Sequence, residues 1–116
     1  MTTLVEYFRR QSNKANWSYQ DQLCASDGNP LWTTTPVDLV ITMSLRDRAG
    51  VGQITLASND GSGQIEAADD GMMNVNVTPT TLGGLSEGLY DVWLKIVTDD
   101  FTINRVYGRL PICEGI

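Results

Sequence analysis

Hydrophobic and polar residues alternate along several segments of the chain, and the alternation is clearest in four of them. These segments are Trp17–Ala25, Val40–Arg46, Met73–Thr78 and Leu89–Val97. In the second segment, Ile41, Met43 and Leu45 are each followed by a polar residue. A repeat of two residues places the apolar side chains on one face of a strand. We therefore predict a half-buried β-strand in each segment.

Three further segments, Gln53–Ala57, Gln64–Ala67 and Phe101–Leu110, have a weaker strand pattern. Clusters of Gly, Asp, Asn and Pro separate the seven segments roughly every ten residues, which is typical of a sandwich or barrel. We predict one small antiparallel β-sandwich of about seven strands, either Ig-like or jelly-roll-like. The pattern leaves the strand order open. Pro111 is expected to end the last strand because proline has no backbone N–H.

Two parts of the chain depart from the strand pattern. Residues 1–15 are polar and irregular, and we predict an N-terminal arm there, ahead of a sandwich domain at 16–116. One or two helical turns in this arm would place Leu4, Tyr7 and Phe8 on a shared apolar side. Another short helical turn is predicted at Thr80–Leu85, where it would close one end of the core.

The segment Leu89–Val97 is the strongest predicted strand, and it is apolar on both faces. One face carries Tyr90, Val92, Leu94 and Ile96, and the other carries Leu89, Trp93 and Val97. Burial on both faces indicates a central strand or a surface that a partner covers. Trp93 is therefore a candidate contact residue.

Composition narrows the function. The 116 residues include 8 basic and 14 acidic ones, for a formal net charge of −6, and no histidine. Without a basic stripe we expect no nucleic-acid partner. Without an apolar run of roughly 20 residues we expect no membrane partner. The first residues lack a signal-peptide pattern, so a reducing cytoplasm is the expected compartment. The absence of histidine removes the commonest general base and metal ligand, so we expect no enzyme.

The acidic pairs and the two cysteines are the remaining candidates for chemistry. Asp69-Asp70 and Asp99-Asp100 suit turns, a carboxylate pair or a calcium site, and turns are favoured because Asp-Gly pairs in β proteins are usually hairpin turns. Two cysteines are too few for a zinc site. Pairing of Cys24 with Cys113 stays open, although a reducing compartment disfavours it. We expect neither a metal nor a cofactor.

Aromatic residues allow two interpretations. Trp17, Trp32, Trp93, Tyr19, Tyr90 and Tyr107 could line a sugar-binding platform or fill the core. The core interpretation is favoured, since each ring buries a large apolar area. Trp32 is the expected exception, because it lies in a loop rich in Pro and Thr, where an exposed contact is plausible.

Several short motifs follow one another in a recognisable order. They are Trp17–Ala25 before Asp27-Gly28-Asn29-Pro30, Pro36-Val37-Asp38-Leu39 before Ile41–Arg46, Asp70–Val77 before Thr80-Thr81-Leu82, Leu89–Leu94, and Arg105–Ile112. This order resembles a β-sandwich module of tailed-bacteriophage virion proteins, found near the N-terminus of baseplate, tail-fibre and head-fibre components. The resemblance spans roughly residues 17–113. It differs in the inserted Leu31–Thr35, and we expect no fibre or receptor-binding domain after Cys113.

The resemblance implies a non-enzymatic structural protein of a phage, prophage or gene-transfer particle. Such a protein would act as a connector or decoration piece in the head, neck, tail or fibre. Its expected partners are other virion structural proteins and further copies of itself, in a homo-oligomer. It would be found in the virion, after assembly in the bacterial cytoplasm.

Docking in such a particle would bury apolar area around aromatic anchors. The predicted interface residues are Leu4, Tyr7, Phe8, Trp32 and Trp93. Deletion of residues 1–14 is then expected to abolish docking and leave the fold intact. The alternative is a carbohydrate- or cell-surface-binding module that uses exposed aromatic residues, with Trp32 at its centre.

Overall fold

The protein is an all-β sandwich, as the alternation predicted. The computed structural model describes residues 6–113, and the side chains from residue 8 onward. Its strands are β1 (Glu6–Tyr7), β2 (Gln11–Ser12), β3 (Trp17–Gln22), β4 (Val40–Arg46), β5 (Gly52–Ala57), β6 (Ile65–Ala68), β7 (Met72–Val77), β8 (Gly88–Val97) and β9 (Thr102–Cys113), with one helix, α1 (Pro79–Leu82). The seven predicted strands correspond to β3–β9.

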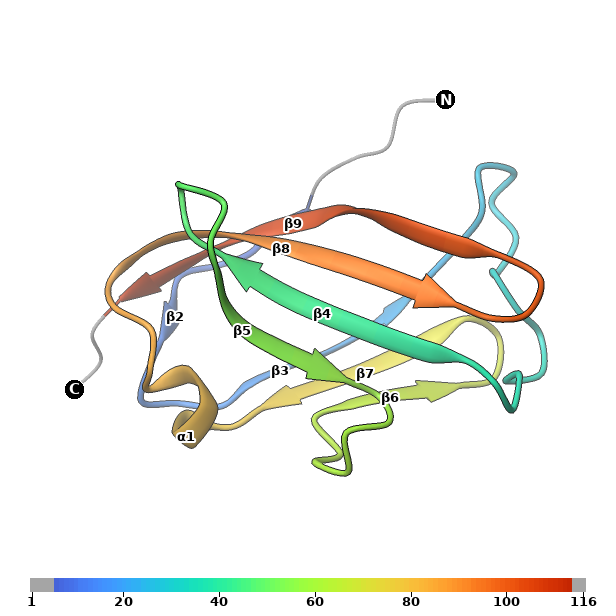
Figure 1. Ribbon diagram of the computed structural model, residues 1–116, viewed down its shortest axis with the longest axis horizontal. Helices are drawn as coiled ribbons and strands as arrows, with labels where there is room; N and C mark the ends of the chain where they lie inside the picture. Colours follow the sequence, from blue (N-terminus) through green and yellow to red (C-terminus); the bar gives the residue numbers. More distant parts are fainter. Residues whose placement is uncertain (1–5, 114–116) are drawn as a thin grey trace.

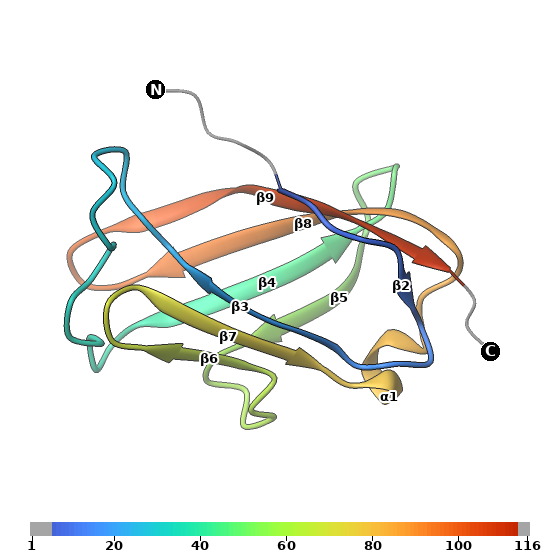
Figure 2. The same ribbon diagram turned by 180° about the vertical axis from the view of Figure 1, so that it is seen from behind.

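Two sheets form the layers of the sandwich (Figure 1). The large sheet has the order β1–β9–β8–β4–β5, with β2 also paired to β9, and the small sheet has the order β3–β7–β6. The view from behind shows the small sheet in front of the large one (Figure 2). Strands β3–β9 pair antiparallel, as predicted. The chain changes sheet four times, between β2 and β3, between β3 and β4, between β5 and β6, and between β7 and β8.

The core lies between the sheets, and period-two alternation fills it from both sides. In β4, Ile41, Met43 and Leu45 are fully buried while the residues between them are half-buried. In the small sheet, Val75 and Val77 of β7 are buried and belong to the same core. The same parity that buries one set of side chains turns the alternate set outward. The outer face of the large sheet is therefore lined by the alternate residues of β4 and β8.

Residues 6–7 and 11–12 form two short strands in the arm where the sequence predicted a helical turn. Both β1 and β2 pair parallel with β9, which makes the large sheet mixed. The Phe8 N–H donates to the Arg109 carbonyl oxygen at 3.0 Å. A segment of one or two turns is too short to be stable as an isolated helix. The edge of β9 offers its backbone groups partners instead, so the helical prediction was wrong.

Strand β9 also continues past Pro111, where the sequence predicted its end. Arg109 and Cys113 both direct their carbonyl oxygens toward the β1–β2 side, because these oxygens accept from Phe8 and Asn13 N–H groups. Pro111 lies two residues from each and faces the same side. There it lies opposite the break between β1 and β2, so no ladder hydrogen bond is lost. The missing N–H is therefore tolerated.

A β-bulge in β9 connects the two sheets. Trp93 pairs with Val106 and Val92 with Gly108, so Tyr107 is an additional residue in β9. Its side chain is buried, and its hydroxyl donates to the Asp21 carboxylate in the small sheet. The bulge thereby directs one residue of β9 toward the core while β8 keeps its alternation.

The predicted helical turn near Thr80 is present as α1, at one end of the sandwich (Figure 1). The Thr78 hydroxyl caps it by accepting from the Thr81 N–H, and Pro79 begins it. The Gln64 side-chain oxygen accepts from the Thr78 N–H at 3.0 Å and from the Thr81 hydroxyl at 2.9 Å. Leu82 is fully buried and closes this end of the core.

Candidate functional site

The outer face of the large sheet carries a cluster of polar and aromatic side chains around Trp93. In β4 they are the residues that alternate with the buried Ile41, Met43 and Leu45. Antiparallel pairing sets Thr42 opposite Lys95 and Ser44 opposite Trp93. We name this cluster the Trp93 surface, and it consists of Thr42, Ser44, Arg46, Thr55, Trp93, Lys95 and Asn104.

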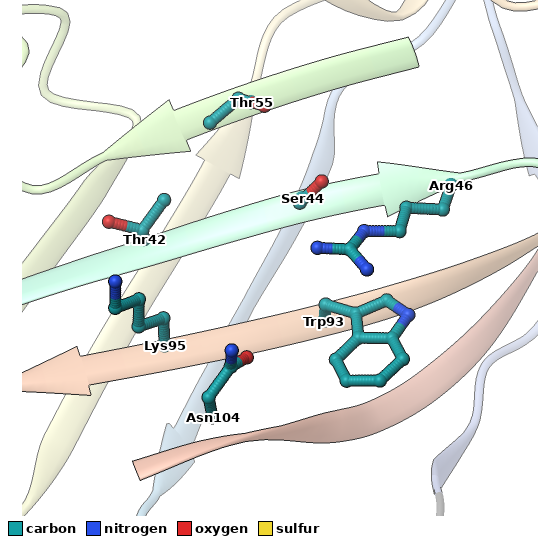
Figure 3. Close-up of a pocket in the computed structure, with 7 residues that line it drawn as sticks. All are labelled: Thr42, Ser44, Arg46, Thr55, Trp93, Lys95 and Asn104. Carbon is teal, nitrogen blue, oxygen red and sulfur yellow. The ribbon is translucent and has the colours of Figure 1, made fainter. Parts of the chain in front are cut away.

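Trp93 is held on this surface by Arg46. The Arg46 guanidinium carbon lies 4.6 Å from the centre of the Trp93 ring, which is a cation–π contact. Figure 3 shows the guanidinium beside the indole, with Lys95 extending toward Thr42 on the neighbouring strand. Arg46 pairs with Asp91, two residues before Trp93, so it is a diagonal neighbour of the indole. Both Trp93 and Arg46 are half-buried, and they present a fixed anchor to solvent.

A shallow hollow of about 260 Å³ lies over the Trp93 surface. Hydroxyl and amide groups from Thr42, Ser44, Thr55 and Asn104 line it beside the two basic side chains. A smaller hollow of about 140 Å³ lies further along β8, lined by Arg48, Leu89, Asp91 and Arg109. Because Asp91 is the cross-strand partner of Arg46, the two hollows adjoin on one face.

The charge on this face differs from that of the whole chain. Asp91 pairs with Arg109, with 3.3 Å between the carboxylate oxygen and the guanidinium Nε. Among the described side chains, Arg46 and Lys95 have no acidic group within ion-pair distance. The lining of the two hollows thus includes four basic residues and one acidic residue. The chain as a whole has a net charge of −6.

The expectation that Trp32 is exposed was wrong. Only 6% of this residue is accessible, and it belongs to the hydrophobic core. Its indole N–H donates to the Ala68 carbonyl oxygen at 2.7 Å. Trp32 therefore cannot serve as a contact on the molecular surface or as the centre of an aromatic platform.

The inserted loop 31–35 is buried in part because the β6–β7 turn binds it. The Asp70 N–H donates to the Thr33 carbonyl oxygen at 2.7 Å. The Asp69 carboxylate accepts from the Thr35 N–H and hydroxyl, at 2.9 and 2.8 Å. These two bonds lower the pKa of Asp69 below its usual value. Asp69 and Asp70 thus form part of the β6–β7 turn, as predicted. They also bind the loop 31–35, in which Trp32 is buried.

The other predicted interface residues have different positions. Leu4 and the side chain of Tyr7 lie outside the described part of the chain. Phe8 is half-buried and packs on Trp17, Tyr19 and Tyr107, with ring centres 5.2, 5.2 and 5.8 Å away. Of the six aromatic residues considered for a platform, Trp17, Trp32, Tyr90 and Tyr107 are buried. Trp93 is thus the predicted contact residue that the structure places on an outer sheet face.

The other acidic turns and the cysteines take part in local structure. Hydrogen bonds from Ser62 and Ala57 lower the pKa of Asp60, and those from Asn29 lower the pKa of Asp27. Cys24 and Cys113 are both free thiols. Among residues 6–113, no group of three or more His, Cys, Asp and Glu side chains is arranged to hold a metal ion. The helix in this part of the chain is too short to span a membrane.

Sequence patterns pointed to Trp93 but did not single out Arg46 or Lys95. The basic residues are scattered along the chain, and only the pairing of β4 with β8 brings these two beside the indole. The alternation of apolar and polar residues along Val40–Arg46 did place Arg46 on the polar side of its strand. The register that makes it a neighbour of Trp93 comes from the folded sheet.

No protein-family model matches this chain, and no curated protein sequence matches it. Function is therefore inferred from the chemistry of the Trp93 surface.

Proposed function

We propose that this protein is a non-enzymatic docking module that binds other proteins through the Trp93 surface. The proposal rests mainly on the contact between Trp93 and Arg46 on the outer face of the large sheet. Tryptophan and arginine are the residues most enriched among those that dominate binding energy at protein interfaces. Arg46 holds the indole in place, so less side-chain entropy is lost when a partner covers it.

Such a module fits a structural part of a phage, prophage or gene-transfer particle. This setting is supported by the motif order that resembles virion β-sandwich modules. The partners are then other virion structural proteins and further copies of this chain. The protein acts in the head, neck, tail or fibre, without a cofactor, and assembles in the bacterial cytoplasm.

Mass spectrometry of purified particles tests the proposed setting. Particles are prepared from an induced culture of the source organism, and the peptides of this chain are quantified against the portal or major tail protein. We expect a fixed copy number per particle. Absence from the particles, with abundant protein in the same lysate, would contradict the virion setting.

Substitution of Trp93 tests the proposed surface. We expect W93A to lower incorporation into particles strongly, because a central aromatic anchor typically contributes about 2 kcal/mol or more to binding. Gln20 is exposed in β3 of the small sheet, so Q20A is the matched control on the opposite face. Wild-type incorporation of W93A, with an unchanged thermal midpoint, would remove the Trp93 surface from the proposal.

A further inference from the structure

The local charge of the Trp93 surface points to the chemistry of its partner. Arg46 and Lys95 lie on it, and Arg48 and Arg109 line the adjoining hollow. These four residues are half of the eight basic residues in a chain of net charge −6. Asp91, the acidic residue in these linings, is paired with Arg109. The face is therefore an electropositive area on an acidic protein.

Another acidic residue, Asp47, lies next to Arg46 in sequence but faces its own turn. Its Oδ1 accepts from the Ala49 and Val51 N–H groups at 3.0 Å, and its Oδ2 accepts from the Gln53 side-chain amide. The carboxylate is thus engaged by the turn and by Gln53, and it does not pair with Arg46. Neither Arg46 nor Lys95 has an ion-pair partner among the described residues, so both side chains can donate hydrogen bonds to a partner molecule.

We infer that the Trp93 surface binds a short acidic segment of a partner protein, whose carboxylates meet Arg46 and Lys95. This inference rests on the proposed docking function and names the partner's chemistry. A guanidinium that stacks on an indole through its face keeps its N–H edge free for two parallel bonds to a carboxylate. Ser44, Thr55 and Asn104 add neutral hydrogen-bonding groups around the two charges.

The size and charge of the surface favour a short acidic segment over a long polyanion. Two adjoining hollows with four basic residues match a few carboxylates. A nucleic acid or an acidic polysaccharide would extend beyond them, over a molecule whose net charge of −6 repels it. A protein segment can confine its negative charge to the contact.

Nuclear magnetic resonance on the nitrogen-15-labelled protein tests this inference, because it detects weak binding and the protein contains its own controls. The probe is a soluble polyglutamate peptide at low ionic strength. We expect the indole N–H signal of Trp93 to shift on titration. The signals of Trp17 and Trp32 should stay in place, since both residues are buried. Added salt should reverse the shift.

Charge-removing variants make the test specific. R46Q/K95Q should weaken polyglutamate binding by about tenfold, because two ion pairs are lost. The matched control R9Q/K14Q removes one exposed arginine and one exposed lysine outside both hollows, and it should bind like the wild type. Equal weakening in both variants, or no Trp93 shift in the wild type, would overturn the inference.

Two further probes address the other anions. Oligogalacturonate and single-stranded oligothymidylate are titrated under the same conditions, and both should perturb Trp93 less than polyglutamate does. A stronger response to either one would overturn the acidic-peptide inference in favour of that class of ligand.

Particle incorporation separates failure of this inference from failure of the docking function. If W93A loses incorporation while R46Q/K95Q keeps it, docking through the Trp93 surface stands and the acidic partner is wrong. If W93A and R46Q/K95Q both incorporate normally, docking through the Trp93 surface is contradicted, and the acidic-partner inference that rests on it is contradicted as well. Loss in both variants but not in R9Q/K14Q supports both proposals.

Discussion

Trp32 and Trp93 are the same residue type in opposite roles. Trp93 lies half-exposed under Arg46 on the outer face of the large sheet. Trp32 is buried, and its indole N–H is bonded to the Ala68 carbonyl oxygen. A buried carbonyl that loses its donor keeps the cost of desolvation, whereas an exposed indole has water as an alternative partner. The free energy of unfolding should therefore depend on Trp32, and docking should depend on Trp93.

Replacement of each tryptophan by phenylalanine tests this division. W32F should lower the free energy of unfolding by about 1–3 kcal/mol, because the Ala68 carbonyl is left unsatisfied. W93F should change it by about 0.5 kcal/mol or less, as at most surface positions. Urea unfolding followed by far-ultraviolet circular dichroism measures both. Equal destabilisation by the two substitutions would contradict the assigned roles.

Because of the Tyr107 hydroxyl, the free energy of unfolding should change with pH in the alkaline range. Burial, followed by the neighbouring Tyr19 and the hydrogen bond to Asp21, raises the pKa of Tyr107 well above its ordinary value of 10.0. Above a pH of about 10, the unfolded chain releases this proton while the folded protein keeps it. The free energy of unfolding therefore falls as pH rises through that range.

Y107F removes this contribution. Above a pH of about 10, its unfolding free energy should fall less steeply than that of the wild type, by up to about 1.4 kcal/mol per pH unit. The slope is informative even though the variant also loses the bond to Asp21, since that loss shifts stability at every pH. Chemical denaturation across the alkaline range gives both slopes, and parallel slopes would contradict the buried, protonated hydroxyl.

At the scale of elements, the β6–β7 turn is the point where three segments meet. Asp70 and Gly71 both have positive φ, of 62° and 72°. A Cβ on Gly71 would lie 2.6 Å from the Leu23 carbonyl oxygen and 3.1 Å from the Pro30 side chain. The turn is thus packed against the chain that follows β3, and glycine is required for both its conformation and its size.

G71A should therefore destabilise the protein by about 3 kcal/mol or more, combining backbone strain with a backbone clash. Gly61 is the matched control, because it has a φ of 82° with nothing within 4 Å of an added Cβ. G61A carries the strain alone and should cost about 1–2 kcal/mol. Thermal unfolding compares the two, and equal losses would mean that the close contact at Gly71 is relaxed without cost.

At the scale of the whole molecule, the segment from β1 to β2 belongs to the fold. Strands β1 and β2 cover one edge of β9, and Phe8 packs on three aromatic rings that span both sheets. An uncovered edge strand is a template for pairing with other chains. From these contacts we predict that deletion of residues 1–14 affects the fold, whereas the sequence alone predicted that the fold would stay intact.

Deletion of residues 1–14 should lower stability by about 3 kcal/mol or more, from the lost aromatic contacts and backbone pairing. The truncated protein should also aggregate more readily. Deletion of residues 1–5 keeps β1, β2 and Phe8, and it serves as the control. Light scattering and thermal unfolding measure both effects. A fully stable, monomeric Δ1–14 variant would show that β1 and β2 are dispensable.

The sequence by itself determined the all-β class, the seven strands β3–β9, the short helix α1 and the inward-facing residues. Those features follow from local alternation and turn chemistry, which act over a few residues. Tertiary structure decided the strand order, the parallel pairing of β1 and β2 with β9, and the passage of β9 through Pro111. It also buried Trp32 and set Arg46 beside Trp93. These outcomes depend on which backbone edges and side chains meet across long sequence separations, and no local pattern contains that information.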